Sequence, residues 1–367
     1  MKSQILIFSL VVVLFFGCKK ESDEPTKKPL SIPTEYGYDS VSFQNNASQA
    51  LNYANVLVDF ENELKKGRNI SYLLEKSQLD SMFQILRPIT PQPIQPMIDN
   101  YINEIVLASG KTFDPNNPTP EGGIYGGYIY NKEGLDLHEL IIKTIWGVAF
   151  IQQMNNISSN ANNVNQVDPL LVYYGAHPYF KNSSDASKHG IYADKFSANY
   201  AARRDNNDGN GFYHQIKKNF LKLKAAISAG EPYQTEKQDA IKSIFENIEK
   251  AYAATIINYC FSAISKLNLS NPTENDFSSA IHAIGEAIAF TTNIKNMNQK
   301  KLSVSDIDFI FNQLNYQPTT QINKFVTETF NQLPKLNNII QRIKSVYGFS
   351  DSEIEDFKKN WIQVQNR

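Results

Sequence analysis

The chain has 367 residues, of which 41% are apolar and 20% are charged, and its formal net charge at pH 7 is -1. This composition is typical of a globular protein that buries a substantial core. The near-neutral charge and the lack of a long basic run give no electrostatic reason for nucleic-acid binding, so we expect no nucleic-acid partner.

The N-terminus has the pattern of an export signal. A positive start at Lys2 precedes residues 5–16, which are apolar apart from Ser9 and lead into Gly17 and Cys18. The run is shorter than the roughly 20 apolar residues that span a bilayer. It therefore predicts a signal peptide at residues 1–17 rather than a permanent membrane helix.

Cys18 is the expected lipidation site. A small residue followed by cysteine, directly after the apolar run, resembles the lipobox of bacterial lipoproteins, although Phe16 is bulkier than the usual residue there. We therefore expect cleavage before Cys18 and attachment to a membrane through lipid on this residue. The alternative is an ordinary export signal that happens to contain a cysteine.

Residues 18–40 are polar, contain prolines and lack apolar periodicity, which predicts a flexible lipidated tether. Glu21, Asp23 and Glu24 follow Cys18 closely. Acidic residues at this place resemble the surface-export signals of Bacteroidetes lipoproteins. The expected location is the outer membrane, lipid-anchored and exposed at the cell surface, with a periplasm-facing position as the alternative.

Helical periodicity dominates residues 41–367. Apolar residues recur at helical spacing within 241–259 and again within 278–297, whereas 133–154 has so little polar face that a buried central helix is expected. Cys260 follows the first of these segments and is expected to be a small core residue. Because Cys18 is the expected lipidation site and the chain has two cysteines, Cys260 has no partner for an internal disulfide.

The remaining helices are expected at 42–66, 71–86, 94–108, 187–202, 212–229, 303–315, 321–346 and 351–362. The predicted fold class is therefore all-α. We expect up-and-down helical bundles in two packed lobes, 41–175 and 185–367, with long Gly/Pro/Tyr-rich loops.

The longest of these loops covers residues 112–130, and further irregular stretches are expected at 175–185 and 205–211. Tyrosines in the first two loops suit a sugar or peptide surface, but they equally suit attachment of the loops to helices. The polar stretch 206–211 lacks the final carboxylate of an EF-hand, because Lys217 stands there, and is interpreted as a turn.

Two histidine–glutamate pairs are the candidate chemical groups. His282 and Glu286 are four residues apart and share a helix face, where they could bind a metal or share a proton. His138 and Glu139 are adjacent in the other strongly apolar helix, so only one of them can face the same site. We expect the two helices to pack together with all four residues as candidate metal ligands. The alternative is that they bond neighbouring groups within the core.

Three blocks carry a family resemblance, namely 143–150, 196–205 and 282–290. In this order they resemble an uncharacterised family of Bacteroidetes lipoproteins that is helical and similar to imelysins. His282, Glu286 and Phe290 are similar to that family's His, Ser-Glu and Gly-Phe positions, with Gly285 where serine is usual. Residues 167–175 depart from the family's polar pattern and keep only Asp168 and the aromatic-glycine end.

The resemblance implies a non-enzymatic binding role, for a small ligand or a metal related to iron or haem. The chain lacks the Gly-x-Ser-x-Gly, His-Glu-x-x-His and phosphate-loop motifs of common enzyme classes. We therefore expect a cell-envelope lipoprotein that binds a small ligand or a metal ion. A scaffold or accessory subunit of an outer-membrane nutrient-uptake complex, with an envelope protein as partner, is the alternative, and a hydrolase comes third.

Overall fold

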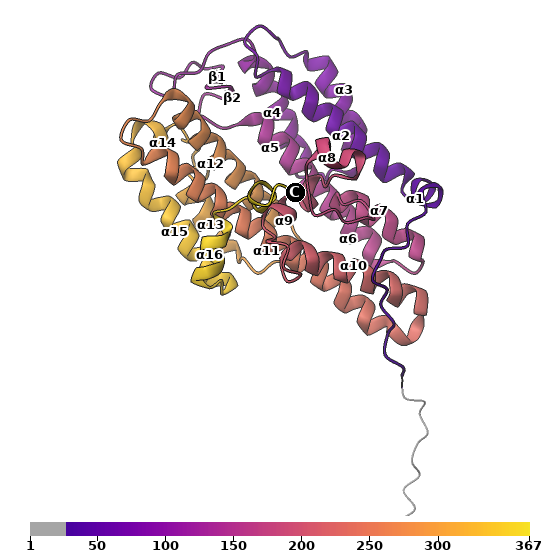
Figure 1. Ribbon diagram of the computed structural model, residues 1–367. Coiled ribbons are helices and arrows are strands. Elements are labelled where there is room, and N and C mark those ends of the chain that lie inside the picture. Colours follow the sequence, from indigo (N-terminus) through magenta and orange to yellow (C-terminus); the bar gives the residue numbers. More distant parts are fainter. Residues whose placement is uncertain (1–26) are drawn as a thin grey trace, which may run out of the picture.

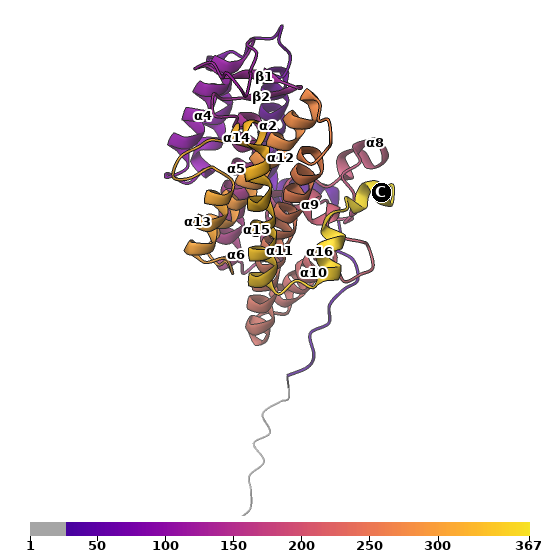
Figure 2. The same cartoon turned by 90° about the vertical axis from the view of Figure 1, so that its left-hand side faces the viewer.

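The computed structural model describes residues 27–367, and within this range the chain is helical except for loops and one short hairpin (Figures 1 and 2). The all-α prediction is confirmed. The expected signal peptide and Cys18 lie outside the described residues. No helix among residues 27–367 is long and apolar enough to cross a membrane.

The first helices are α1 (Ser40–Asn46), α2 (Ser48–Lys66), α3 (Lys76–Leu86) and α4 (Gln95–Ala108). Asp39 begins α1 by accepting a hydrogen bond from the Ser42 amide at 2.8 Å, which satisfies one of the free amides of the first turn. The apolar stripe of α2, including Leu57, Phe60 and Leu64, is fully buried. It packs against α3, α5 and α7.

The central helix runs through α5 (Leu137–Thr144), a π-helical segment (Ile145–Phe150) and α6 (Ile151–Ser159). Every residue of α5 and of the π-helical segment is buried, which confirms the prediction of a central buried helix. Asp136 caps α5 by accepting a hydrogen bond from the Glu139 amide at 3.2 Å. The segment is therefore a place where any polar side chain must find a partner inside the protein.

The second half contains two long helices, α11 (Gln234–Leu267) and α12 (Glu274–Lys295), which pack along each other. A capping box between Thr273 and Asp276 begins α12. The other helices are α7 (Val167–Tyr174), α8 (Ala186–His189), α9 (Phe196–Arg203), α10 (Phe212–Ala229), α13 (Val304–Gln313), α14 (Lys324–Thr327), α15 (Thr329–Tyr347), α16 (Asp351–Phe357) and α17 (Trp361–Val364).

Buried apolar side chains from both halves of the chain form one continuous cluster, which extends from Tyr36 to Ile362. The two expected lobes therefore share a core. Helices α5 and α12, one from each half, are in extensive contact, as expected. Cys260 is 1% exposed and lies in this core, and burial raises the pKa of its thiol.

Several local expectations were wrong, and the expected helices 42–66, 321–346 and 351–362 are each divided in two. The loop 112–130 contains a hairpin of β1 (Gly123–Tyr125) and β2 (Tyr128–Tyr130), because Gly126 and Gly127 both adopt the positive φ that a two-residue turn needs. Helix α7 forms where no helix was expected and ends at Gly175. The expected helix 187–202 is divided into α8 and α9, since Gly190 adopts a φ of 55° between them.

The predicted tether, residues 18–40, includes residues that belong to the folded domain. Residues 27–39 have no helix or strand, but Tyr36 is 4% exposed, and its hydroxyl donates to the Asp168 carboxylate at 2.7 Å. The Lys224 ammonium lies 3.9 Å from the Tyr36 ring centroid. Residue 36 is therefore part of the folded domain rather than of a flexible segment.

Candidate functional site

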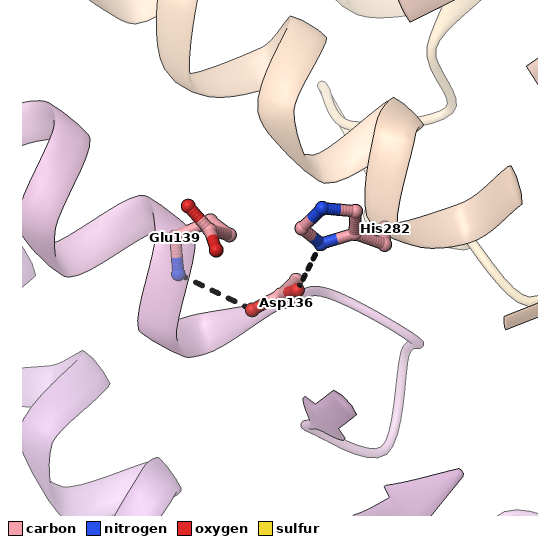
Figure 3. Close-up of side chains that lie close together, drawn as sticks. All are labelled: Asp136, Glu139 and His282. Carbon is pink, nitrogen blue, oxygen red and sulfur yellow. Dashed lines mark hydrogen bonds and ion pairs between the residues drawn. The ribbon is translucent and has the colours of Figure 1, made fainter. Parts of the chain in front are cut away.

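The polar site lies between α5 and α12, and Figure 3 shows three of its side chains pointing toward one another. Nδ1 of His282 is 2.8 Å from Oδ2 of Asp136. The other Asp136 oxygen accepts from the Glu139 amide, so one carboxylate caps α5 and contacts α12 at once. Asp136, Glu139 and His282 each offer a ligand atom within 4.8 Å of the others.

Two cations complete the site. Oε1 of Glu139 is 2.7 Å from Arg68 Nη2, and its Oε2 is 2.5 Å from Lys143 Nζ. The same Lys143 ammonium is 3.2 Å from Oε2 of Glu286, and Oε1 of Glu286 is 3.4 Å from Nε2 of His282. We call these six residues the α5–α12 network: Arg68, Asp136, Glu139, Lys143, His282 and Glu286.

The network contains three acidic and three basic side chains, and its protonation follows from their pairing. Burial opposes the charge on His282, but Asp136 and Glu286 outweigh it and raise the pKa of His282 well above its ordinary value. Burial likewise opposes the charge on Lys143, but Glu139 and Glu286 raise its pKa well above the usual range. Burial also opposes the charge on Glu139, but Lys143 and then His138 hold the pKa of Glu139 well below its usual range. Cationic bases and anionic acids are therefore mutually stabilised.

Aromatic rings from two parts of the chain contact the network. Tyr128, in strand β2, stacks on the His282 ring with the centroids 4.0 Å apart, and the Arg68 guanidinium lies 4.8 Å from the Tyr128 centroid. The centroid of the Tyr200 ring, in α9, lies 5.2 Å from Lys143 Nζ. The hairpin therefore forms part of the site. It is attached to α12 where Tyr130 donates to the Ser278 carbonyl at 2.8 Å.

The donor set of Asp136, Glu139 and His282 suits a divalent metal by chemistry, since carboxylate oxygens and imidazole nitrogen are common ligands. The Arg68 and Lys143 cations make metal binding at this site unfavourable. Each Glu139 oxygen faces Arg68 or Lys143, and both His282 nitrogens face carboxylates. A metal would have to displace a proton from His282 and approach two fixed positive charges. The geometry thus fits a self-contained ion-pair network better than a metal centre.

Three of the four sequence-predicted residues meet in the network, namely Glu139, His282 and Glu286. His138 lies beside it, with Nδ1 2.7 Å from Arg68 and 3.1 Å from Glu139. Sequence reasoning missed Asp136, Lys143 and Arg68. Two of these could have been found from local sequence. Asp136 stands directly before an apolar helix, where an aspartate cap is preferred. Lys143 is four residues after Glu139, at the spacing of a helical ion pair. Arg68 could not, because it follows α2 and reaches the site only through the tertiary fold.

A cavity of about 630 Å³ is lined in part by Tyr200, whose ring also contacts Lys143. It is lined by residues of α9, of the second half of α11 and of the C-terminal segment around α17. Its wall is formed by Tyr200, Arg203, Arg204, Thr255, Asn258, Tyr259, Phe261, Ser262, Ile264, Ser265, Lys358, Asn360 and Gln363. Tyr259 lines the cavity, and burial and then the charge of Glu286 raise the pKa of its hydroxyl. Sequence reasoning did not find this cavity, because its walls are far apart in the chain.

No curated protein and no solved structure matches the chain. The family match covers the second half of the protein, from the end of α7 to the loop before α16. It includes α12 with His282 and Glu286, and most of the cavity wall, but not α5. The family model that matches, over residues 173–350, is that of DUF4856, a domain of unknown function.

Proposed function

We propose that this protein is a cell-envelope lipoprotein whose helical domain binds a small ligand without transforming it. The cavity between α9, α11 and the C-terminal segment carries the proposal. Its volume of about 630 Å³ is within the range of small-molecule sites, which are roughly 300–1,000 Å³. Its wall is mostly polar or charged and also contains the rings of Tyr200, Tyr259 and Phe261, so it offers both groups that orient a ligand and apolar surface that contacts it.

The neighbouring network supports binding rather than catalysis. A general acid or base needs a proton that can be exchanged near neutral pH. In the network, the pKa of His282 is raised and that of Glu139 is lowered, so both groups are held in their charged forms. The network is therefore suited to hold Tyr200 and Tyr259 in place behind the cavity, rather than to transfer protons.

The ligand test starts from the full-length lipidated protein purified in mild detergent. A small molecule released by denaturation and detected by mass spectrometry is the expected result. Ser262→Trp, which fills the cavity, should abolish retention of this molecule. Ser48→Trp, at an exposed position of α2, is the matched control and should retain it. Equal retention by both variants would contradict the proposed site.

The lipoprotein part of the proposal rests on Cys18 and the apolar run before it. Cys18→Ala should move the protein from the membrane fraction to the soluble fraction, and intact mass should show an acyl chain only on the wild type. The expected outer-membrane location is tested by sucrose-gradient separation of the membranes, and exposure at the cell surface by protease treatment of whole cells. A membrane-bound Cys18→Ala protein without acyl mass on the wild type would refute lipidation.

Metal binding is a second candidate, favoured by the closeness of Asp136, Glu139 and His282. Elemental analysis of the purified protein tests it. A metal bound there should be lost in Glu139→Ala, with Glu63→Ala as a control for removing another buried glutamate.

The scaffold alternative is supported by a separate feature, a cluster of aromatic side chains formed by Tyr38, His177, Tyr179 and Tyr192. Pull-down from cell envelopes would reveal a partner.

A further inference from the structure

We propose that the cavity beside Tyr200 takes a small organic anion, whose carboxylate or phosphate group is bound by Arg203 and Arg204. The inference rests on the proposed ligand-binding function and specifies its ligand. Among the described residues, three basic side chains and no acidic one line the cavity, the basic ones being Arg203, Arg204 and Lys358. Carboxylates and phosphates are the groups that the planar guanidinium fork binds best.

The environment of Arg204 is the strongest evidence for an anion site. This residue is 7% exposed, and within residues 27–367 no carboxylate oxygen lies within 4.0 Å of it. Its Nη1 donates to the Phe357 carbonyl at 2.7 Å, while its Nε is buried without a hydrogen-bond partner in the part of the chain that the structure describes. Burial lowers its pKa to about 10. An unpaired buried charge is costly, so this residue lacks an anion that the fold itself does not provide.

Arg203 stands beside it at the end of α9. Its Nε donates to Asn199 at 2.9 Å, and its guanidinium lies 4.8 Å from the Tyr200 ring centroid, but the described chain places no carboxylate within 4.0 Å of it. Glu286 and Glu139 act on it only from a distance, and both are already paired with cations of the network. Lys358 is different, because Glu355 is 2.6 Å from its ammonium.

The structural roles open to these arginines do not explain their arrangement. Basic residues at the end of a helix are favoured by the helix dipole, but that effect needs no burial. The bond from Arg204 to the Phe357 carbonyl is not essential, because Asn258 Nδ2 donates to the same oxygen at 2.7 Å. The rings of Tyr259 and Phe261 add flat apolar surface to the same cavity. The ligand therefore has a charged end and an apolar body.

Binding is tested on the full-length lipidated protein in detergent by isothermal titration calorimetry at constant ionic strength. The probes are phenyl phosphate and benzoate, with benzyl alcohol as the neutral analogue. Either anion should bind at least tenfold more tightly than benzyl alcohol. Arg203→Gln should weaken anion binding by roughly 10-fold or more, as expected for loss of a charge-assisted hydrogen bond. Arg342→Gln, which removes an arginine paired with Asp306, is the matched control and should bind like the wild type.

A stability measurement separates a ligand-binding arginine from a structural one. Arg204→Met in ligand-free protein should raise Tm by about 2 °C or more, because it removes an uncompensated buried charge. It should also abolish the stabilisation by phenyl phosphate. A structural arginine predicts the opposite sign, a fall in Tm, with stabilisation by the anion kept in the refolded variant.

The outcomes distinguish the two proposals. Suppose that the wild type and Arg203→Gln retain the same neutral molecule, whereas Ser262→Trp does not. The anion inference is then overturned, while the proposed binding function stands. If Ser262→Trp changes nothing and no probe binds, both are overturned. Selective anion binding that is lost in Arg203→Gln and kept in Arg342→Gln supports both.

Discussion

His282 lies between two carboxylates, with Asp136 at Nδ1 and Glu286 at Nε2. A neutral imidazole has one N–H donor, so it can satisfy only one of them, whereas the imidazolium ion donates to both. The buried network therefore depends on a histidine that stays protonated where free histidine loses its proton. This makes the free energy of unfolding depend on pH in a defined direction.

The stability of the protein should fall as pH rises above about 6.5, the ordinary pKa of histidine. The pKa of His282 is raised on folding, so its contribution is complete below that pH and is lost as pH rises toward the folded-state pKa. Urea unfolding between pH 6 and 9 measures the slope, up to about 1.4 kcal/mol per pH unit. His282→Gln should flatten this slope, whereas His189→Gln should keep it. An unchanged slope in His282→Gln would refute the assigned role.

At the scale of helices, α12 approaches the central helix closely at two glycines. A Cβ on Gly285 would lie 3.1 Å from the Asp136 Cβ, which is a tight contact. A Cβ on Gly147, in the π-helical segment, would lie 1.8 Å from Nδ2 of Asn293. Asn293 is fully buried and has little room to move. The absence of side chains at these positions thus lets α12 bring His282 and Glu286 to α5.

Gly147→Ala should lower the free energy of unfolding by about 1–3 kcal/mol, because the added methyl group overlaps the Asn293 amide. Urea denaturation followed by circular dichroism measures the loss. Asn293→Ala removes the obstructing amide, so the double variant should recover much of the stability lost in Gly147→Ala. Additive effects of the two changes would show that this contact does not limit the approach of α12.

At the scale of the whole molecule, the segment before α1 is held against the helical domain by Tyr36. Its ring lies in the shared core, its hydroxyl bonds Asp168 of α7, and its carbonyl accepts from Lys224 of α10 at 2.8 Å. A membrane anchor at Cys18 would therefore connect to the domain at residue 36 rather than at residue 40. That shortens the segment that separates the domain from the membrane.

Tyr36→Ala should cost about 3 kcal/mol of stability through the lost core packing, and the effect should be visible in proteolysis. In the wild type, limited proteolysis should stop before residue 36. In Tyr36→Ala it should proceed to the start of α1, near residue 40. Tyr233→Ala is the control, since that tyrosine bonds the Lys28 carbonyl without being buried. The same cleavage limit in wild type and Tyr36→Ala would contradict docking by Tyr36.

The sequence alone determined the helical class and most helix positions, because apolar spacing and caps act within one or two turns. It indicated α11, α12 and the buried central helix. It also paired His282 with Glu286, since residues four apart share a helix face. The β1–β2 hairpin was missed because its Gly-Gly turn joins strands of only three residues each, too short for visible alternation. Helix α7 was missed because its apolar run is no longer than a strand.

Only the tertiary structure decided which charges meet. Arg68 reaches Glu139 across 71 positions of the chain, and Asp136 reaches His282 across 146, so no local pattern could pair them. The cavity depends on the same kind of distant contact, since α9, α11 and the C-terminal segment each supply one wall. Burial turns Arg204 from an ordinary surface charge into one that needs an anion, and burial is a property of the packed fold.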